Sequence, residues 1–116
     1  MDLRHSNPPV REALEDALAA VAEPTRRLVV DLLARGPRSA GALAAAAGTS
    51  PQAMSRHLRV LRRCGLLAEN HDPTDSRRRI YSLRPEGLTE IKGWLEEIDA
   101  FWSDQLMAFK KHMEGR

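Results

Sequence analysis

Five basic side chains lie within eight residues of the stretch SPQAMSRHLRVLRRCGLL, residues 50–67: Arg56, His57, Arg59, Arg62 and Arg63. A guanidinium group is permanently charged and donates several hydrogen bonds in one plane, so it binds carboxylates, phosphates and the acceptor edges of bases. Ser50 is a good N-cap, Pro51 suits the first helical position and Gly65 suits a helix end. The stretch therefore predicts a short basic helix.

A helical projection divides this stretch into two faces. Met54, Leu58 and Leu61 fall within about 40° of one another, at about 100° per residue, and predict a buried stripe. His57 lies nearer to that stripe than to the opposite side, which predicts packing or a hydrogen bond beside the helix. The remaining side chains of interest are expected on or beside the outward face: Gln52, Ser55, Arg56, Arg59 and Arg63.

These outward residue types suit the major groove of DNA. Arginine can donate two hydrogen bonds to guanine, and glutamine can bond adenine in the same way. Readers of bases usually lie near the N-terminus of such a helix, which points to Gln52, Ser55 and Arg56. Arg59 and Arg63 are expected to meet phosphates, with Ser50 as a further contact at the helix start.

The charge of the chain is uneven, although its formal net charge is only +2. Residues 51–84 carry eight arginines and three acidic residues, which gives this segment +5 and leaves −3 on the rest. A basic middle segment predicts a surface that faces a polyanion. An acidic protein partner is the alternative to DNA. No paired carboxylates, glycine-rich phosphate loop or nucleophilic triad is evident, so we do not expect an enzyme.

The elements around the basic helix can be located from periodicity and from capping residues. Apolar spacing predicts a first helix over 10–21, and Pro24 opens a second helix that ends at Gly36 and buries Leu28, Val29, Leu32 and Leu33. Ser39 is the N-cap of a small-residue helix that Gly48 ends. Two short helices joined by a tight turn are typical of a helix-turn-helix.

A hairpin and a long helix complete the chain. Residues 66–83 read as two strands with turn formers between them, and the second strand is rich in arginine. Of its arginines, Arg77 and Arg79 are expected on the side that faces DNA. After Pro85, apolar residues from 88 to 113 recur at steps of three and four, which predicts one long helix. The fold class is therefore mainly α with a small β-hairpin: a winged helix-turn-helix with about five helices and a two-stranded wing.

The chain of 116 residues is expected to form one domain over 10–116, which binds DNA and dimerises, after a flexible arm at 1–9. No secretory signal or membrane span is evident, so a cytoplasmic location is expected. Cys64 is the one cysteine, and it fits either a buried apolar position or an oxidation switch. No cofactor is expected.

The ordered motifs EPTRRLVVDLLARGPRSAGALAAA, SPQAMSRHLRVLRRCGLL and RRRIYSL resemble the ArsR family of winged-helix transcriptional repressors. The resemblance covers roughly residues 11–110. It implies a homodimer that binds an inverted-repeat operator in double-stranded DNA and represses until an inducer releases it.

In this family the first and last helices commonly build the dimer. Four of the five aromatic side chains lie on the last helix, which favours an interface there over a role confined to the monomer core. The expected interface residues are Leu14, Leu18, Trp94, Ile98, Phe101, Trp102 and Phe109.

The familiar metal sites of the family are not expected in this chain. The thiolate site would fall at about Ser39 and Gly41, and neither is a cysteine. The site on the last helix would fall at about Pro85, Gly87, Ile98 and Phe101, and none of these side chains ligates zinc. The resemblance therefore predicts a repressor without a metal ligand set.

Overall fold

The computed structural model describes residues 8–115, with side chains from residue 12 onward, so most of the expected arm at 1–9 lies outside the described residues. Helix α1 begins at Pro8, two residues before the expected start. In chain order the elements are α1 (Pro8–Ala22), α2 (Pro24–Leu33), β1 (Arg38–Ser39), α3 (Ala40–Ala47), α4 (Pro51–Arg63), β2 (Leu67–His71), β3 (Arg79–Leu83), a 3₁₀ turn (Pro85–Leu88) and α5 (Thr89–Glu114).

The predicted capping residues set the boundaries of the central helices. The hydroxyl oxygens of Ser39 and Ser50 accept hydrogen bonds from the amides of Ala42 and Ala53, both at 3.1 Å. Each bond satisfies one of the free donors at a helix start. Helix α3 ends at Gly48, whose φ of 64° is the left-handed conformation that glycine adopts most easily. These capping predictions are confirmed.

The core lies between α2, α3, α4 and the base of the hairpin. Its largest fully buried side chains are Val29, Leu43, Met54, Leu58, Leu61, Leu66 and Leu67. Burial of each such side chain stabilises the fold by about 1.5–3 kcal/mol before the entropy cost is counted. Leu28 was expected inside but is 37% exposed, because the buried face of α2 centres on Val29 and Leu33.

The sheet has three antiparallel strands in the order β1-β3-β2, one more than the predicted wing. The third strand, β1, pairs Arg38 with Tyr81 and Ser39 with Ile80. A strand of two residues has no measurable alternation, so the sequence pattern could not reveal it. This pairing links the hairpin to the start of α3, so it holds the wing in a fixed position relative to the helix-turn-helix.

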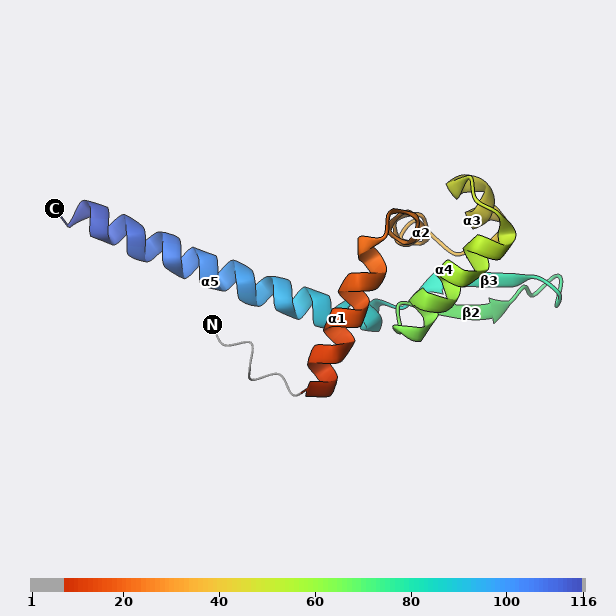
Figure 1. Ribbon diagram of the computed structural model, residues 1–116, viewed down its shortest axis with the longest axis horizontal. Coiled ribbons are helices and arrows are strands. Elements are labelled where there is room, and N and C mark those ends of the chain that lie inside the picture. The colour runs from red at the N-terminus through yellow and green to blue at the C-terminus, as the bar shows by residue number, and fades with distance from the viewer. Residues whose placement is uncertain (1–7, 116) are drawn as a thin grey trace.

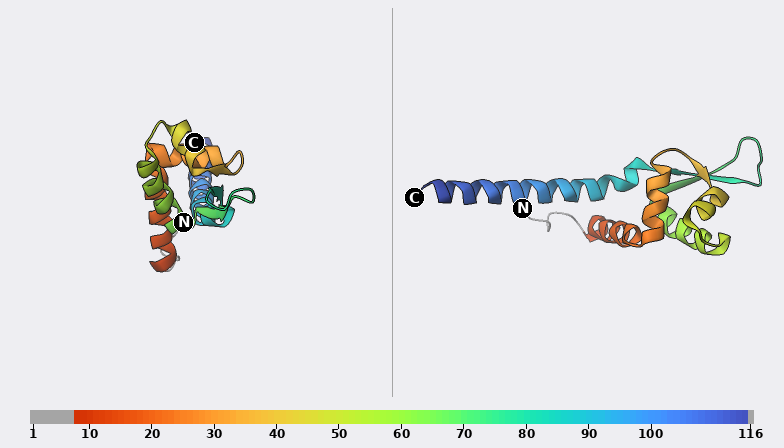
Figure 2. Two further views of the ribbon diagram at one scale, coloured as in Figure 1. Left: turned by 90° about the vertical axis from the view of Figure 1, so that its right-hand side faces the viewer. Right: turned by 90° about the horizontal axis from the view of Figure 1, so that it is seen from above.

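Helix α5 runs away from the rest of the molecule, as Figure 1 and Figure 2 show. The structure measures 69 × 28 × 23 Å, and α5 and the wing extend in opposite directions along its longest axis. None of the 26 residues of α5 is buried. Among the described residues, no helix has both the length and the apolar character needed to cross a membrane. A long helix without a buried residue lacks the packing that normally stabilises one.

Candidate nucleic-acid interface

The buried stripe of α4 confirms the helical projection. Met54, Leu58 and Leu61 are 1%, 2% and 0% exposed, so the helix is held against the core along one line. The rest of its surface then has to face solvent, since the side chains of an α-helix repeat every 3.6 residues. The residues exposed on α4 are Pro51, Gln52, Ser55, Arg56, Arg59, Arg62 and Arg63.

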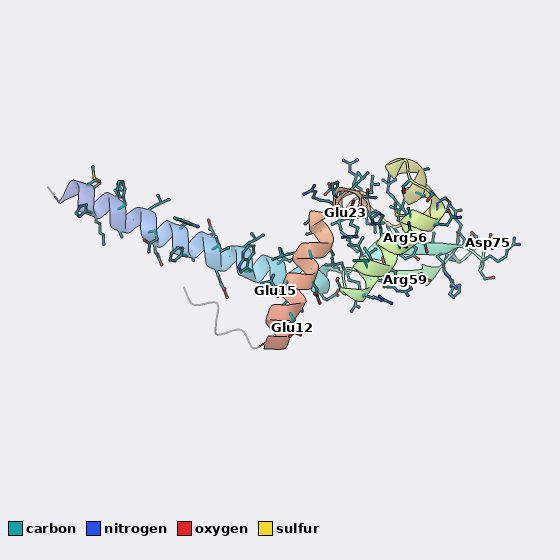
Figure 3. The ribbon with its side chains drawn as sticks, viewed as in Figure 1. Glu12, Glu15, Glu23, Arg56, Arg59 and Asp75 are labelled. Atoms are coloured by element: carbon teal, nitrogen blue, oxygen red, sulfur yellow. The ribbon has the colours of Figure 1, made fainter. Side chains whose placement is uncertain are left out.

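The N-terminal half of α4 carries an open depression lined by Pro51, Gln52, Ser55, Arg56 and Arg59. Figure 3 shows Arg56 and Arg59 following one another along this helix. The depression thus combines one amide, one hydroxyl and two guanidiniums. These groups can donate hydrogen bonds to the O6 and N7 atoms of guanine and can bond the N6 and N7 atoms of adenine. They can also reach phosphate oxygens.

The outward arginines of α4 differ in their ion pairing. Between residues 12 and 115, no carboxylate forms an ion pair with Arg56, Arg59 or Arg63. Arg62 differs, because its Nη1 bonds the carboxylate of Glu69 on β2. Helix α4 therefore presents to a polyanion three guanidiniums that no carboxylate of residues 12–115 neutralises.

His57 ties α4 to the junction of α1 and α2, as its place on the projection predicted. Its Nδ1 lies 3.3 Å from Nη1 of Arg26 and 3.7 Å from a carboxylate oxygen of Glu23. The backbone N–H of Arg26 donates to Glu23 at 2.8 Å, and this bond holds the pKa of the Glu23 carboxyl below its usual value. Arg26 Nε also donates to the carbonyl of Ala20 at 2.7 Å. The network links α4 to the junction of α1 and α2.

The wing arginines 77, 78 and 79 have three different environments. Arg77 is at the tip, where its side chain is 91% exposed and its Nε lies 3.5 Å from Asp75. Arg78 turns back to α3 and donates from Nη2 to the hydroxyl of Ser39 at 3.1 Å. Of the three, Arg77 has the most exposed side chain. The tether made by Arg78 could not be read from the sequence, because its partner lies 39 residues away.

Arg79 is held on the hairpin itself. Its Nε lies 3.2 Å from a carboxylate oxygen of Glu69, and its guanidinium lies against the ring of His71, its partner across the strands. A phosphate would therefore compete with Glu69 for the guanidinium of Arg79. Sequence reasoning missed Glu69; the available signal was an acidic residue in the strand that pairs with the arginine-rich one.

The tip of the wing is a side-chain-stabilised turn around Asp72. Its Oδ1 accepts from the amide of Thr74 at 2.8 Å and from the hydroxyl of Thr74 at 2.7 Å. The Thr74 hydroxyl first, and then its amide, hold the pKa of Asp72 below its ordinary value of 3.8. A carboxylate that holds its neighbours in this way sets the shape of the turn.

This lowered pKa makes the order of the turn depend on pH. The ionised carboxylate stabilises the folded turn fully above the ordinary pKa, and that contribution disappears as the pH falls through the lowered pKa. We expect the amide proton signal of Thr74 in an NMR titration to move with a midpoint below 3.8. A midpoint at or above that value would contradict the turn described here. An Asp72→Asn variant should abolish the titration.

A second surface lies on α1 and α5. Five of the residues expected at a dimer interface are partly exposed: Leu14, Leu18, Trp94, Ile98 and Phe101. The other two are mostly exposed, Trp102 at 56% and Phe109 at 63%. Leu95, Leu106, Met107 and Met113 are also exposed. The aromatic side chains of α5 thus do not complete the core of the single chain. A row of large apolar side chains in water indicates a surface that associates.

Cys64 lies at the end of α4 and is partly buried against α1. Its thiol donates to the backbone carbonyl of Asp16 at 3.7 Å. Burial raises the pKa of the Cys64 thiol, and the nearby Asp16 carboxylate adds to this rise. Less thiolate forms under such conditions, so the packing role fits this position better than the oxidation switch.

Within the described part of the chain, no three histidine, cysteine, aspartate or glutamate side chains gather into a group that could hold a metal ion. At the familiar family positions, the Ser39 hydroxyl caps α3 and accepts from Ala42. His5 lies outside the described residues.

Comparison with known proteins agrees with this arrangement. A helix-turn-helix domain family matches residues 21–70, which run from the end of α1 to the first wing strand. The chain is 37% identical over 99 residues to the HTH-type transcriptional regulator Rv2034 of Mycobacterium tuberculosis, covering 85% of this chain and 87% of that protein.

Two solved structures share the fold. An ArsR-like transcriptional regulator from Rhodococcus sp. RHA1 has 30% identity and a TM-score of 0.71, covering 89% of this chain and 94% of that one. A possible transcriptional regulator for arsenical resistance has 41% identity and a TM-score of 0.63, covering 80% and 94%. With the free arginine face of α4 and the wing beside it, these relatives show that the chain belongs to the ArsR family of winged-helix transcriptional regulators, which bind DNA and are not enzymes.

Proposed function

We propose that this regulator is a homodimeric repressor that recognises an inverted-repeat operator and needs no metal ion. The observation that carries the proposal is the pairing of two surfaces on one chain: a polar and cationic face on α4, and an uncovered apolar face on α5. A two-fold dimer built on the second surface presents the first surface twice, which suits a palindromic site.

The residues of α4 and the wing contact either base edges or phosphates, according to their position. Gln52, Ser55 and Arg56 lie in the depression near the helix N-terminus and read base edges. Arg59, Arg63 and the exposed Arg77 neutralise phosphates, and Ser50 contacts the backbone beside the N-terminus of the helix. Arg79 joins this group only when its bond to Glu69 opens.

The dimer interface consists of α1 and α5, through Leu14, Leu18, Trp94, Ile98, Phe101, Trp102 and Phe109. Support comes from exposure: burial against a second copy would remove Trp102, Phe109 and their neighbours from water, at about 25 cal/mol for each Å² of apolar surface. A second copy is the occupant with a matching row of apolar side chains of the same length.

Binding of the purified protein to its own upstream region, against scrambled DNA of the same length and composition, tests this function. A specific operator is expected to bind about a thousandfold or more tightly than the scrambled duplex at physiological salt. Equal affinity for the two duplexes would overturn sequence-specific repression. Operator affinity should be the same with a strong chelator as with added Zn²⁺, and a tenfold difference would contradict metal independence.

Arg77→Ala is expected to weaken binding to operator and scrambled DNA alike. A phosphate contact carries no sequence information, so the ratio of the two affinities should stay constant. Loss of one contact should also reduce the slope of log affinity against log salt by about 0.9. Titrations at several KCl concentrations measure both quantities. A change in the affinity ratio would show that the wing arginine reads sequence.

A further inference from the structure

Glu69 is the acidic residue at the boundary between the reading helix and the wing. Its side chain is only 20% exposed and accepts hydrogen bonds or ion pairs from three side chains on two elements. Arg62 approaches from α4. Arg79 Nε approaches from β3 at 3.2 Å, and the Tyr81 hydroxyl donates from the same strand, also at 3.2 Å. These contacts restrain the side chain of Glu69 and those of its three partners.

The strand register explains why these groups meet. Glu69 pairs directly with Tyr81, and His71 pairs with Arg79. The side chains of these two cross-strand pairs therefore lie on the same face of the hairpin. That face lies over α4, where Ser55, Leu58, Arg59, Arg62, Glu69 and Tyr81 line a polar hollow. Ser55 and Arg59 belong to the DNA face proposed above. Glu69 therefore lies at the edge of the surface that would meet the phosphate backbone.

A carboxylate at this place has two electrostatic effects. It forms ion pairs with two of the eight arginines in residues 51–84. The net charge of Glu69, Arg62 and Arg79 together is therefore +1, where the two arginines alone would carry +2. It also repels a phosphate that enters the hollow. Both effects weaken binding to any DNA sequence, because the phosphate term is independent of sequence. They leave the contacts of Gln52 and Arg56 with bases untouched.

We propose that Glu69 sets the strength of sequence-independent DNA binding, because it holds Arg62 and Arg79 away from the phosphate backbone. The inference rests on the DNA recognition proposed above. The phosphate term adds equally to the binding of every sequence, so Glu69 is expected to lower the affinity for operator and for scrambled DNA by the same factor. Burial raises the pKa of the Tyr81 hydroxyl, so this group stays protonated and continues to donate to the carboxylate.

Glu69→Gln tests the proposal with little change in shape. The amide oxygen still accepts from Tyr81, but the negative charge that restrains the two arginines is gone. Affinity for scrambled DNA is expected to rise about tenfold at physiological salt, with a salt slope steeper by about 1–2. Operator affinity is expected to rise by the same factor, so the ratio of operator to scrambled affinity should stay constant. Unchanged or weaker binding to scrambled DNA would overturn the proposal and assign Glu69 to positioning or to folding.

Two control variants separate the released arginines from other effects. Glu12→Gln makes the same change in net charge on α1, at the end of the domain away from the wing (Figure 3), and is expected to change scrambled-DNA affinity less than twofold. Tyr81→Phe removes one hydrogen bond to Glu69 but keeps its charge, and should also leave this affinity unchanged. A tenfold gain in Glu12→Gln would show that net charge alone explains the result and would overturn the proposal.

Arg79→Gln keeps the proposal testable even if the Glu69 variant does not fold. Because Glu69 restrains Arg79, removal of Arg79 is expected to leave the salt slope as it is, whereas Arg77→Ala flattens it. A slope reduced by about 0.9 in Arg79→Gln would show that Arg79 already contacts phosphate and would overturn the restraint. These readouts use scrambled DNA, so they stand apart from the operator preference of the parent protein, whose absence would overturn the proposed function alone.

Discussion

Trp102→Glu is expected to convert the proposed dimer into a monomer. Trp102 lies in the middle of the apolar row on α5 and is 56% exposed in the single chain. The substitution removes about 2–3 kcal/mol of apolar burial on association and places a carboxylate in the interface, at a further cost. We expect the dimer dissociation constant to rise at least 100-fold, measured by sedimentation equilibrium.

Ala100→Glu is the matched control for this result. Ala100 is exposed on α5 and lies about 160° around the helix from Trp102, so it adds the same charge on the opposite side. It is expected to remain dimeric. If Trp102→Glu also remained dimeric, the interface would lie elsewhere on the chain. Operator affinity should fall together with dimerisation, because each monomer can then occupy only one half-site.

Arg56→Ala should cause the largest loss of sequence recognition on α4. Arg56 lies in the depression beside Gln52 and Ser55, and no carboxylate between residues 12 and 115 forms an ion pair with it. A bidentate contact with a base is worth about 1–3 kcal/mol of discrimination, or roughly a 5- to 150-fold loss of operator affinity. Scrambled DNA should lose much less.

Competition titrations with operator variants measure the recognition by Arg56. Each half-site position is substituted in turn, and the Arg56→Ala protein should become indifferent at one position while keeping its preference at the others. Lys111→Ala removes one positive charge from the exposed end of α5 and serves as the charge control. Equal losses for operator and scrambled DNA in Arg56→Ala would make this residue a phosphate contact.

The sequence was sufficient to predict elements that depend on local signals. Caps at Ser39 and Ser50 and the buried stripe of α4 follow from residue types at fixed spacing, and the structure has them where they were expected. His57 was placed beside the stripe by angle alone, and its contacts with Arg26 and Glu23 agree.

Features that depend on distant partners could not be predicted in this way. The strand β1 exists because Arg38 and Ser39 find Tyr81 and Ile80 about 40 residues later. The division of the wing arginines between solvent, Ser39 and Glu69 depends on tertiary packing. Strand alternation placed Arg77 and Arg79 on one side but could not show that Arg79 pairs with Glu69 on the neighbouring strand.

A hydroxyl-radical footprint of the upstream region tests whether two copies of the chain recognise a palindromic site through α4. We expect two protected half-sites related by two-fold symmetry, with centres about 10–10.5 base pairs apart or a multiple of that distance, and two protein chains bound per duplex. Trp102→Glu should abolish the paired pattern. A single asymmetric footprint with one chain bound per duplex, or uniform protection without a site, would contradict the account.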